Sequence, residues 1–83
     1  MLNIEERLQV KIDQNNSELS LRFNSETERT IYDICDVNGR ILKTGKVSDE
    51  STTVDLSKLP SDRYILLILD GDRIFSRHFR WNA

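Results

Sequence analysis

The chain has 83 residues with 12 basic and 14 acidic side chains, so its formal net charge at pH 7 is −2. This length supports one modest hydrophobic core, and we expect residues 1–83 to form a single domain. The composition argues against nucleic-acid binding through a strong positive field and against a membrane span, and the single cysteine, Cys35, rules out an intrachain disulfide.

Alternation of apolar and polar residues predicts the first strands. Over residues 8–12, and again over 19–23, every second residue is apolar, which is typical of a half-buried strand. The polar segment 13–17 between them predicts a turn. The segment before residue 7 lacks the basic and then apolar pattern of a signal peptide, so we expect a cytoplasmic protein, a mature form or a domain of a longer protein.

Residues 29–37 and 40–47 predict a hairpin around Asn38-Gly39. Asn followed by Gly supplies positive φ at both central residues of a type I′ turn at the least cost. We therefore predict that turn, with Cys35 opposite Leu42.

Three further strands are expected at residues 52–56, 63–69 and 73–80. A polar segment, Ser48 to Ser51, precedes the first of them, and Asp70-Gly71-Asp72 predicts the last turn. Seven short strands separated by turns predict an all-β fold, a seven-stranded antiparallel immunoglobulin-like β-sandwich.

The segment from Leu59 to residue 69 predicts a corner followed by the most apolar strand. Residues 64–69 carry no charge and no turn former, so we expect this strand to be covered on both faces. After the corner at Leu59 and Pro60, Tyr64 can bury its ring while its hydroxyl reaches a backbone group across the bend. The predicted core consists of Leu8, Val10, Ile12, Leu19, Leu21, Phe23, Ile34, Leu56, Leu59, Tyr64, Leu66, Ile68 and Phe75.

No catalytic or metal-binding constellation is evident. His78 is the only histidine, and Cys35 lies in the middle of a predicted strand, where a packed thiol is expected. Asp70 and Asp72 fit a turn better than a calcium loop. We therefore expect no enzymatic activity, no metal or other cofactor, and no small-molecule substrate.

The C-terminal strand allows two interpretations. Phe75, Phe79 and Trp81 share strand parity with Arg77, and they could form an aromatic and cationic face for a sugar or peptide. Alternatively the phenylalanines close the core and Arg77 lies at the edge of the sandwich with its stem packed. We favour the second interpretation. Trp81 follows the last predicted strand position.

Three segments carry a resemblance to a known family. Residues 32–42 resemble the "apolar-x-apolar-x-D-x-x-G-R-apolar" hairpin of C-terminal sorting domains from the type IX (Por) secretion system. Residues 54–66 are similar to their "DLS-x-LPSG-x-Y" corner, with Asp62-Arg63 in place of the glycine. Residues 75–79 resemble their closing strand. Residues 19–23 also resemble a strand of small secreted immunoglobulin-like domains of unknown function from Bacteroidetes.

The resemblance implies a non-enzymatic secretion, sorting or surface-attachment domain. Its partner would be the secretion machinery or a cell-surface protein, and its location extracellular, at the cell surface or periplasmic. The alternative is a free-standing immunoglobulin-like binding or structural module of unknown ligand. For a sorting domain we expect recognition through the exposed side chains and free edge of residues 73–80, whereas the free-standing module would use a sheet face or an edge strand to bind a protein partner or a glycan. The candidate binding residues are Arg73, Arg77, His78 and Arg80, of which Arg73, His78 and Arg80 should point outward.

Overall fold

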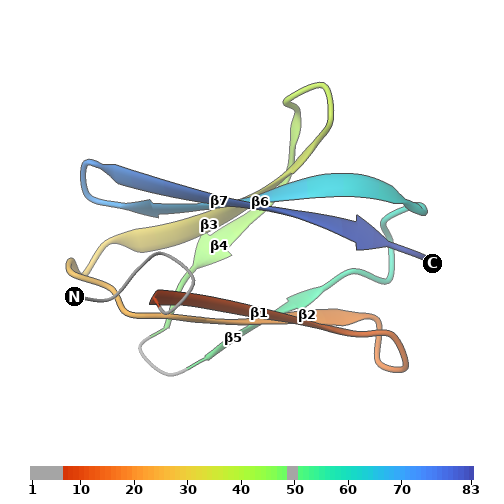
Figure 1. Ribbon diagram of the computed structural model, residues 1–83, viewed down its shortest axis with the longest axis horizontal. Coiled ribbons are helices and arrows are strands. Elements are labelled where there is room, and N and C mark those ends of the chain that lie inside the picture. The colour runs from red at the N-terminus through yellow and green to blue at the C-terminus, as the bar shows by residue number, and fades with distance from the viewer. Residues whose placement is uncertain (1–6, 49–50) are drawn as a thin grey trace.

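Two antiparallel sheets face each other in the computed structural model, which describes residues 7–48 and 51–83 (Figure 1). The strands are β1 (Leu8–Asp13), β2 (Glu18–Phe23), β3 (Thr30–Asp36), β4 (Ile41–Lys46), β5 (Thr52–Asp55), β6 (Asp62–Asp70) and β7 (Arg73–Trp81). One sheet has the order β1-β2-β5 and the other β4-β3-β6-β7. This arrangement confirms the predicted all-β, seven-stranded sandwich. Asp49 and Glu50 of the predicted polar segment lie outside the described residues.

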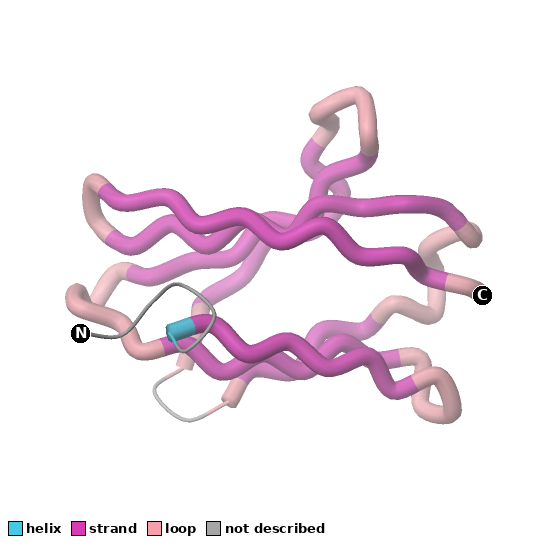
Figure 2. Tube along the Cα trace, in the orientation of Figure 1, coloured by secondary structure: helices cyan, strands magenta, loops and turns pink. Residues whose placement is uncertain are grey.

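The chain passes from one sheet to the other after β2, after β4 and after β5 (Figure 2). All strand pairings within the two sheets are antiparallel. Each crossing carries the backbone out of one hydrogen-bonded ladder, so its polar groups need other partners.

The core lies between the inner faces of the two sheets, where most of the predicted residues are buried. Val10 and Ile12 of the edge strand β1 are only partly buried, whereas Leu8 of the same strand is fully buried. Val54 and Trp81 belong to the core but were absent from the predicted set. Cys35 is a buried free thiol, as expected for a packed mid-strand position.

The prediction that β6 is covered on both faces was wrong. Its inner side chains Leu66 and Ile68 are fully buried, whereas Ile65, Leu67 and Leu69 on the other side are half-buried. The apolar run reflects a central strand flanked by β3 and β7, and the neighbouring strands shield its outer side chains in part. No third layer covers that side within the part of the chain that the structure describes.

The β3–β4 turn differs from the predicted type I′ turn. Asp36 N donates to Arg40 O and Gly39 N donates to Asp36 O, each at 3.0 Å, so the turn consists of Val37, Asn38 and Gly39. Gly39 has φ of +86°, whereas Asn38 has no positive φ. This is the geometry of a type I turn followed by a left-handed glycine, the other common hairpin connection.

The Asp36 carboxylate accounts for the difference. Its Oδ1 accepts hydrogen bonds from the backbone N of Asn38 and of Arg40, each at 2.9 Å, and Oδ2 accepts one from Arg40 Nε at 3.0 Å. These donors, above all the Arg40 backbone, lower the pKa of Asp36. A side-chain acceptor of this kind stabilises the longer turn. As a result Cys35 pairs with Ile41, one residue short of its predicted partner.

A buried carboxylate fixes the first crossing, between β2 and β3. Asp70, at the end of β6, is almost fully buried and accepts hydrogen bonds from the backbone N of Glu26 at 2.8 Å and of Thr27 at 3.1 Å. It also accepts from the hydroxyls of Thr27 at 2.7 Å and Thr30 at 2.9 Å. Burial opposes ionisation of Asp70, but these hydrogen bonds outweigh it and lower its pKa. The charge therefore holds the crossing segment against β6.

Replacing Asp70 with Asn should destabilise the fold by about 2–3 kcal/mol at pH 7, because the variant loses hydrogen bonds to a buried charge. The pKa of Asp70 is lower in the folded protein than the ordinary Asp value of 3.8, so ionisation of this carboxyl stabilises the fold fully above that value. The contribution disappears as pH falls through the folded-state pKa. The gap between wild type and Asp70→Asn should therefore shrink below about pH 4. Urea unfolding across this range measures it.

Asp72→Asn, in the same turn, serves as the control. The Asp72 carboxylate is exposed and makes no hydrogen bond to the described residues, so this variant should follow the wild-type curve. A constant gap between wild type and Asp70→Asn at all pH values would show that the Asp70 charge does not stabilise the crossing.

Two aromatic donors hold the last crossing, the corner between β5 and β6. Tyr64 Oη donates to Pro60 O at 2.5 Å, which is the hydrogen bond expected across the bend. Trp81 Nε1 donates to Leu59 O at 3.1 Å, and its ring is fully buried. Strand β7 therefore extends through Trp81, beyond the predicted boundary, because the indole occupies the end of the core next to the corner.

Tyr64→Phe should lower the free energy of unfolding by about 1 kcal/mol, since it removes one buried hydrogen bond and keeps the ring. Tyr32→Phe is the matched control, because the Tyr32 hydroxyl has no hydrogen-bond partner among the described residues. Chemical denaturation of both variants measures the difference. Equal midpoints for wild type and Tyr64→Phe would mean that the ring contributes by packing alone.

Candidate functional site

Strand β7 is an edge strand, paired with β6 on one side only. Because successive side chains of a strand point to opposite faces, its residues form two rows. The row that faces the other sheet contains Arg73, Phe75, Arg77, Phe79 and Trp81. The row on the outer face of the sheet contains Ile74, Ser76, His78 and Arg80.

The inward row is occupied by structural contacts. The Phe75 ring lies 5.1 Å from the Phe23 ring, and Arg77 Nη2 donates to Leu8 O at 3.2 Å, which links β7 to β1. Arg77 is half-buried at the edge of the sandwich. This geometry agrees with the interpretation in which the aromatic rings close the core, and it does not present Arg77 and the rings as a surface for a ligand.

Arg73 also belongs to the inward row, contrary to the prediction that it points outward. Its Nη1 lies 2.5 Å from Glu26 Oε2, and its guanidinium lies 5.2 Å from the centre of the Phe75 ring. Hydrogen bonding and charge attraction from Arg73 lower the pKa of Glu26. Arg73 therefore connects β7 to the first crossing and is engaged within the fold.

The outward row of β7 carries the exposed candidates. His78 and Arg80 are exposed, and Arg63 of β6, also exposed, lies opposite Arg80. Together with Phe79 they line a shallow surface depression of about 370 Å³. Neither Arg63 nor Arg80 forms an ion pair with any residue of the described part of the chain. The outer side of β6 and β7 therefore presents two arginines and a histidine to solvent.

Arg63 was not among the predicted site residues. The signal was nevertheless present in the sequence, because a tight turn at Gly71 pairs Asp70 with Arg73 and so aligns Arg63 with Arg80. Gly71 has φ of +63°, as the first central residue of a type II′ hairpin turn requires. Counting back from that turn would have placed the two arginines side by side.

The predicted hairpin and corner lie next to each other. Asp36 and Arg40 of the hairpin and Leu59, Pro60 and Tyr64 of the corner line one depression of about 500 Å³. Asn38 and Gly39 lie in the turn beyond it. Two of the three segments that carried the family resemblance, the hairpin and the corner, thus meet at one end of the sandwich.

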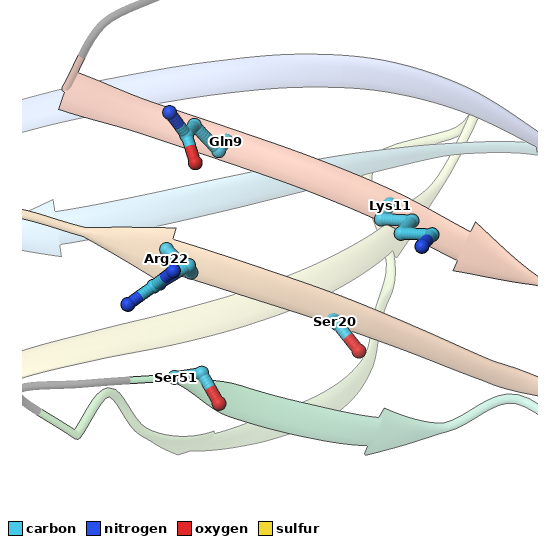
Figure 3. Close-up of a pocket in the computed structure, with 5 residues that line it drawn as sticks. All are labelled: Gln9, Lys11, Ser20, Arg22 and Ser51. Carbon is cyan, nitrogen blue, oxygen red and sulfur yellow. The ribbon is translucent and has the colours of Figure 1, made fainter.

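The outer face of the three-stranded sheet has a different character (Figure 3). Gln9 and Lys11 of β1 and Ser20 and Arg22 of β2 line a depression of about 390 Å³ together with Ser51. Arg22 pairs with Gln9 and Ser20 with Lys11 in the ladder. This face is polar throughout.

No group of three His, Cys, Asp or Glu side chains is positioned to hold a metal ion within residues 7–48 and 51–83. The Cys35 thiol is buried, and burial together with Asp33 and Asp36 raises its pKa, which disfavours a nucleophilic thiolate. Asp70 and Asp72 were the residues compared with a calcium loop in the sequence. The Asp70 carboxylate is buried and accepts hydrogen bonds from the first crossing segment, and Asp72 lies in the turn between β6 and β7. In the described part of the chain, no helix has the length and apolar character needed to cross a membrane.

Comparison with known proteins identifies one family. A family model described as a secretion system C-terminal sorting domain matches residues 6–79. The match extends from the residues before β1 to Phe79 in β7 and includes the hairpin, the corner and most of the exposed edge strand. No curated protein matches the chain.

Proposed function

Because the chain belongs to the secretion system C-terminal sorting domain family and is a type IX (Por) sorting domain, we propose that the secretion machinery recognises the exposed edge of β7. The recognised side chains are His78 and Arg80 of the outward row, with Arg63 beside them. This assignment replaces Arg73 and Arg77 of the sequence-based set, since both are engaged in contacts within the fold.

The observation that supports this proposal is that β7 combines unpaired backbone groups along its free edge with a positive side-chain charge that has no ion-pair partner. An edge strand has unpaired N–H and C=O groups that can accept a strand from a partner protein. Arg80 on that strand and Arg63 beside it on β6 are cationic and form no ion pair within the described part of the chain. Positive charge on an edge also guards against aggregation, so an export assay is needed to separate the two roles.

The proposal also states whether the domain is an enzyme and where in the cell it acts. A sorting domain acts by being recognised, so the role is non-enzymatic and needs no cofactor or small-molecule substrate. Its partner is a protein of the secretion machinery or of the cell surface, and the chain works outside the cytoplasm on a secreted or cell-surface protein. The buried thiol and the isolated exposed His78 support the non-enzymatic assignment.

Surface display tests the assignment. Residues 1–83 are fused behind a signal peptide and a reporter in a host that carries the type IX machinery. Changing Arg63, His78 and Arg80 together to Ser should reduce display about tenfold or more, given the usual worth of charge-assisted hydrogen bonds. Thermal unfolding of the purified variant checks that the fold is retained.

The control variant removes cations from the opposite face. Changing Lys11 and Arg22 to Ser leaves the β7 edge intact and should leave display unchanged. Equal losses in the two variants would contradict recognition through β7. If the wild-type fusion stays in the periplasm, the domain does not act as a sorting signal, and a free-standing binding module is the better description.

A further inference from the structure

The outer face of the four-stranded sheet can be assembled from the strand registers. Ile31, Leu69 and Ile74 lie side by side in one cross-strand row that ends at Lys46. The residues that point to this side, named here the outer face, are Ile41, Thr44 and Lys46 of β4, Ile31, Asp33 and Cys35 of β3, Arg63, Ile65, Leu67 and Leu69 of β6, and Ile74, Ser76, His78 and Arg80 of β7.

Apolar side chains form a continuous surface across the outer face. Ile41 is 61% exposed and Ile74 is 66% exposed, at the two edge strands of the sheet. The half-buried Ile65, Leu67 and Leu69 of β6 connect them. Leu69 lies opposite Ile74, and Ile65 lies opposite the buried Cys35, which pairs with Ile41. Scattered exposed apolar residues need no explanation, but a contiguous set on one face is typical of a protein-binding surface.

The exposed charges of the outer face are all positive. Lys46, Arg63 and Arg80 are exposed, and none of them forms an ion pair with any described residue. Asp33, the one acidic residue on this face, is only 8% exposed. A second copy of the chain that packed face to face would therefore meet cations with cations, which is unfavourable. The electrostatic complement of this face is an acidic surface.

The other sheet provides an internal comparison. The outer face of β1-β2-β5 carries Lys11 and Arg22 together with the acidic residues Asp13, Glu18 and Asp55, and it has no apolar side chain. A small sandwich therefore does not need an apolar outer face. The combination of apolar surface and unpaired positive charge is specific to the four-stranded sheet.

We propose that the outer face docks an acidic protein surface. Apolar side chains of the partner cover Ile41, Leu67 and Ile74, and its carboxylates pair with Arg63 and Arg80. The docking surface is continuous with the outward row of β7, so assigning the partner to the secretion machinery rests on the proposed function. The acidic and apolar chemistry of the partner follows from the outer face itself.

A synthetic peptide in which leucine alternates with glutamate is the probe, and the same peptide with lysine in place of glutamate is its charge control. Titration into isotope-labelled residues 1–83 should shift the amide signals of Leu67, Ile74 and their neighbours on the outer face. The lysine peptide should produce no shifts. Ionic strength should weaken binding of the glutamate peptide, because exposed ion pairs are screened by salt.

Two variants test the apolar contribution. Ile41→Thr with Ile74→Thr keeps β-branched residues at exposed positions and should weaken peptide binding about tenfold through lost apolar contact. Leu42→Thr is the control, because Leu42 lies on the same strand but lines the depression beside Tyr64, on the other side. Leu42→Thr should bind as the wild type does.

The outcomes separate the docking surface from the sorting role. Shifts confined to Lys11 and Arg22, equal binding of both peptides, or self-association without peptide would each overturn an acidic partner for the outer face. Binding to vesicles with anionic lipid but not to the peptide would overturn it as well. Failure of the wild-type fusion to reach the surface would defeat the sorting assignment and leave the peptide result intact.

Discussion

Alternation of side chains along β7 places one row in the core and leaves the other row for the recognition role that we propose. Because neighbouring residues point to opposite faces, the contacts that fix one row leave the other row free. Trp81, Phe75 and Arg77 hold the inward row against the core, the corner and β1. The outward row is therefore presented on a strand whose position is fixed, and its side chains need no rearrangement of the core to meet a partner.

The contacts at the crossings hold the two sheets around β6 and β7. The buried Asp70 carboxylate anchors the segment between β2 and β3 at one end of β6, and Tyr64 and Trp81 bind the corner at its other end. Arg73 adds an ion pair to Glu26 in the same first crossing. Each of these groups is at an end of β6 or β7, so the paired strands that carry the outer face are restrained at both ends.

The strand positions, the sandwich class and the family were largely predictable, because alternation, turn residues and the corner all specify local structure. The errors came from contacts between segments distant in sequence or from side chains that cap a turn. The Asp36 carboxylate changed the hairpin turn, and Glu26 in a crossing segment engaged Arg73. The Asp36 cap and the Glu26 partner cannot be inferred from strand periodicity, whereas the inward position of Arg73 could have been, because Arg73 shares strand parity with Phe75 and Arg77. The position of Arg63 beside Arg80 could have been inferred from the turn at Gly71. The exposure of the outer side chains of β6 could not, because it depends on whether a third layer of structure packs on that side of the sheet.

Site-specific crosslinking during export tests the central claim most directly, namely that the outer face of the four-stranded sheet meets the machinery. A photoreactive amino acid at Ser76, in the outward row of β7, should crosslink to a protein of the secretion machinery when the fusion is caught in transit. The same group at Thr53, exposed on the outer face of the three-stranded sheet, should not crosslink. Crosslinking from Thr53 and none from Ser76 would contradict recognition through β7 and its outer face.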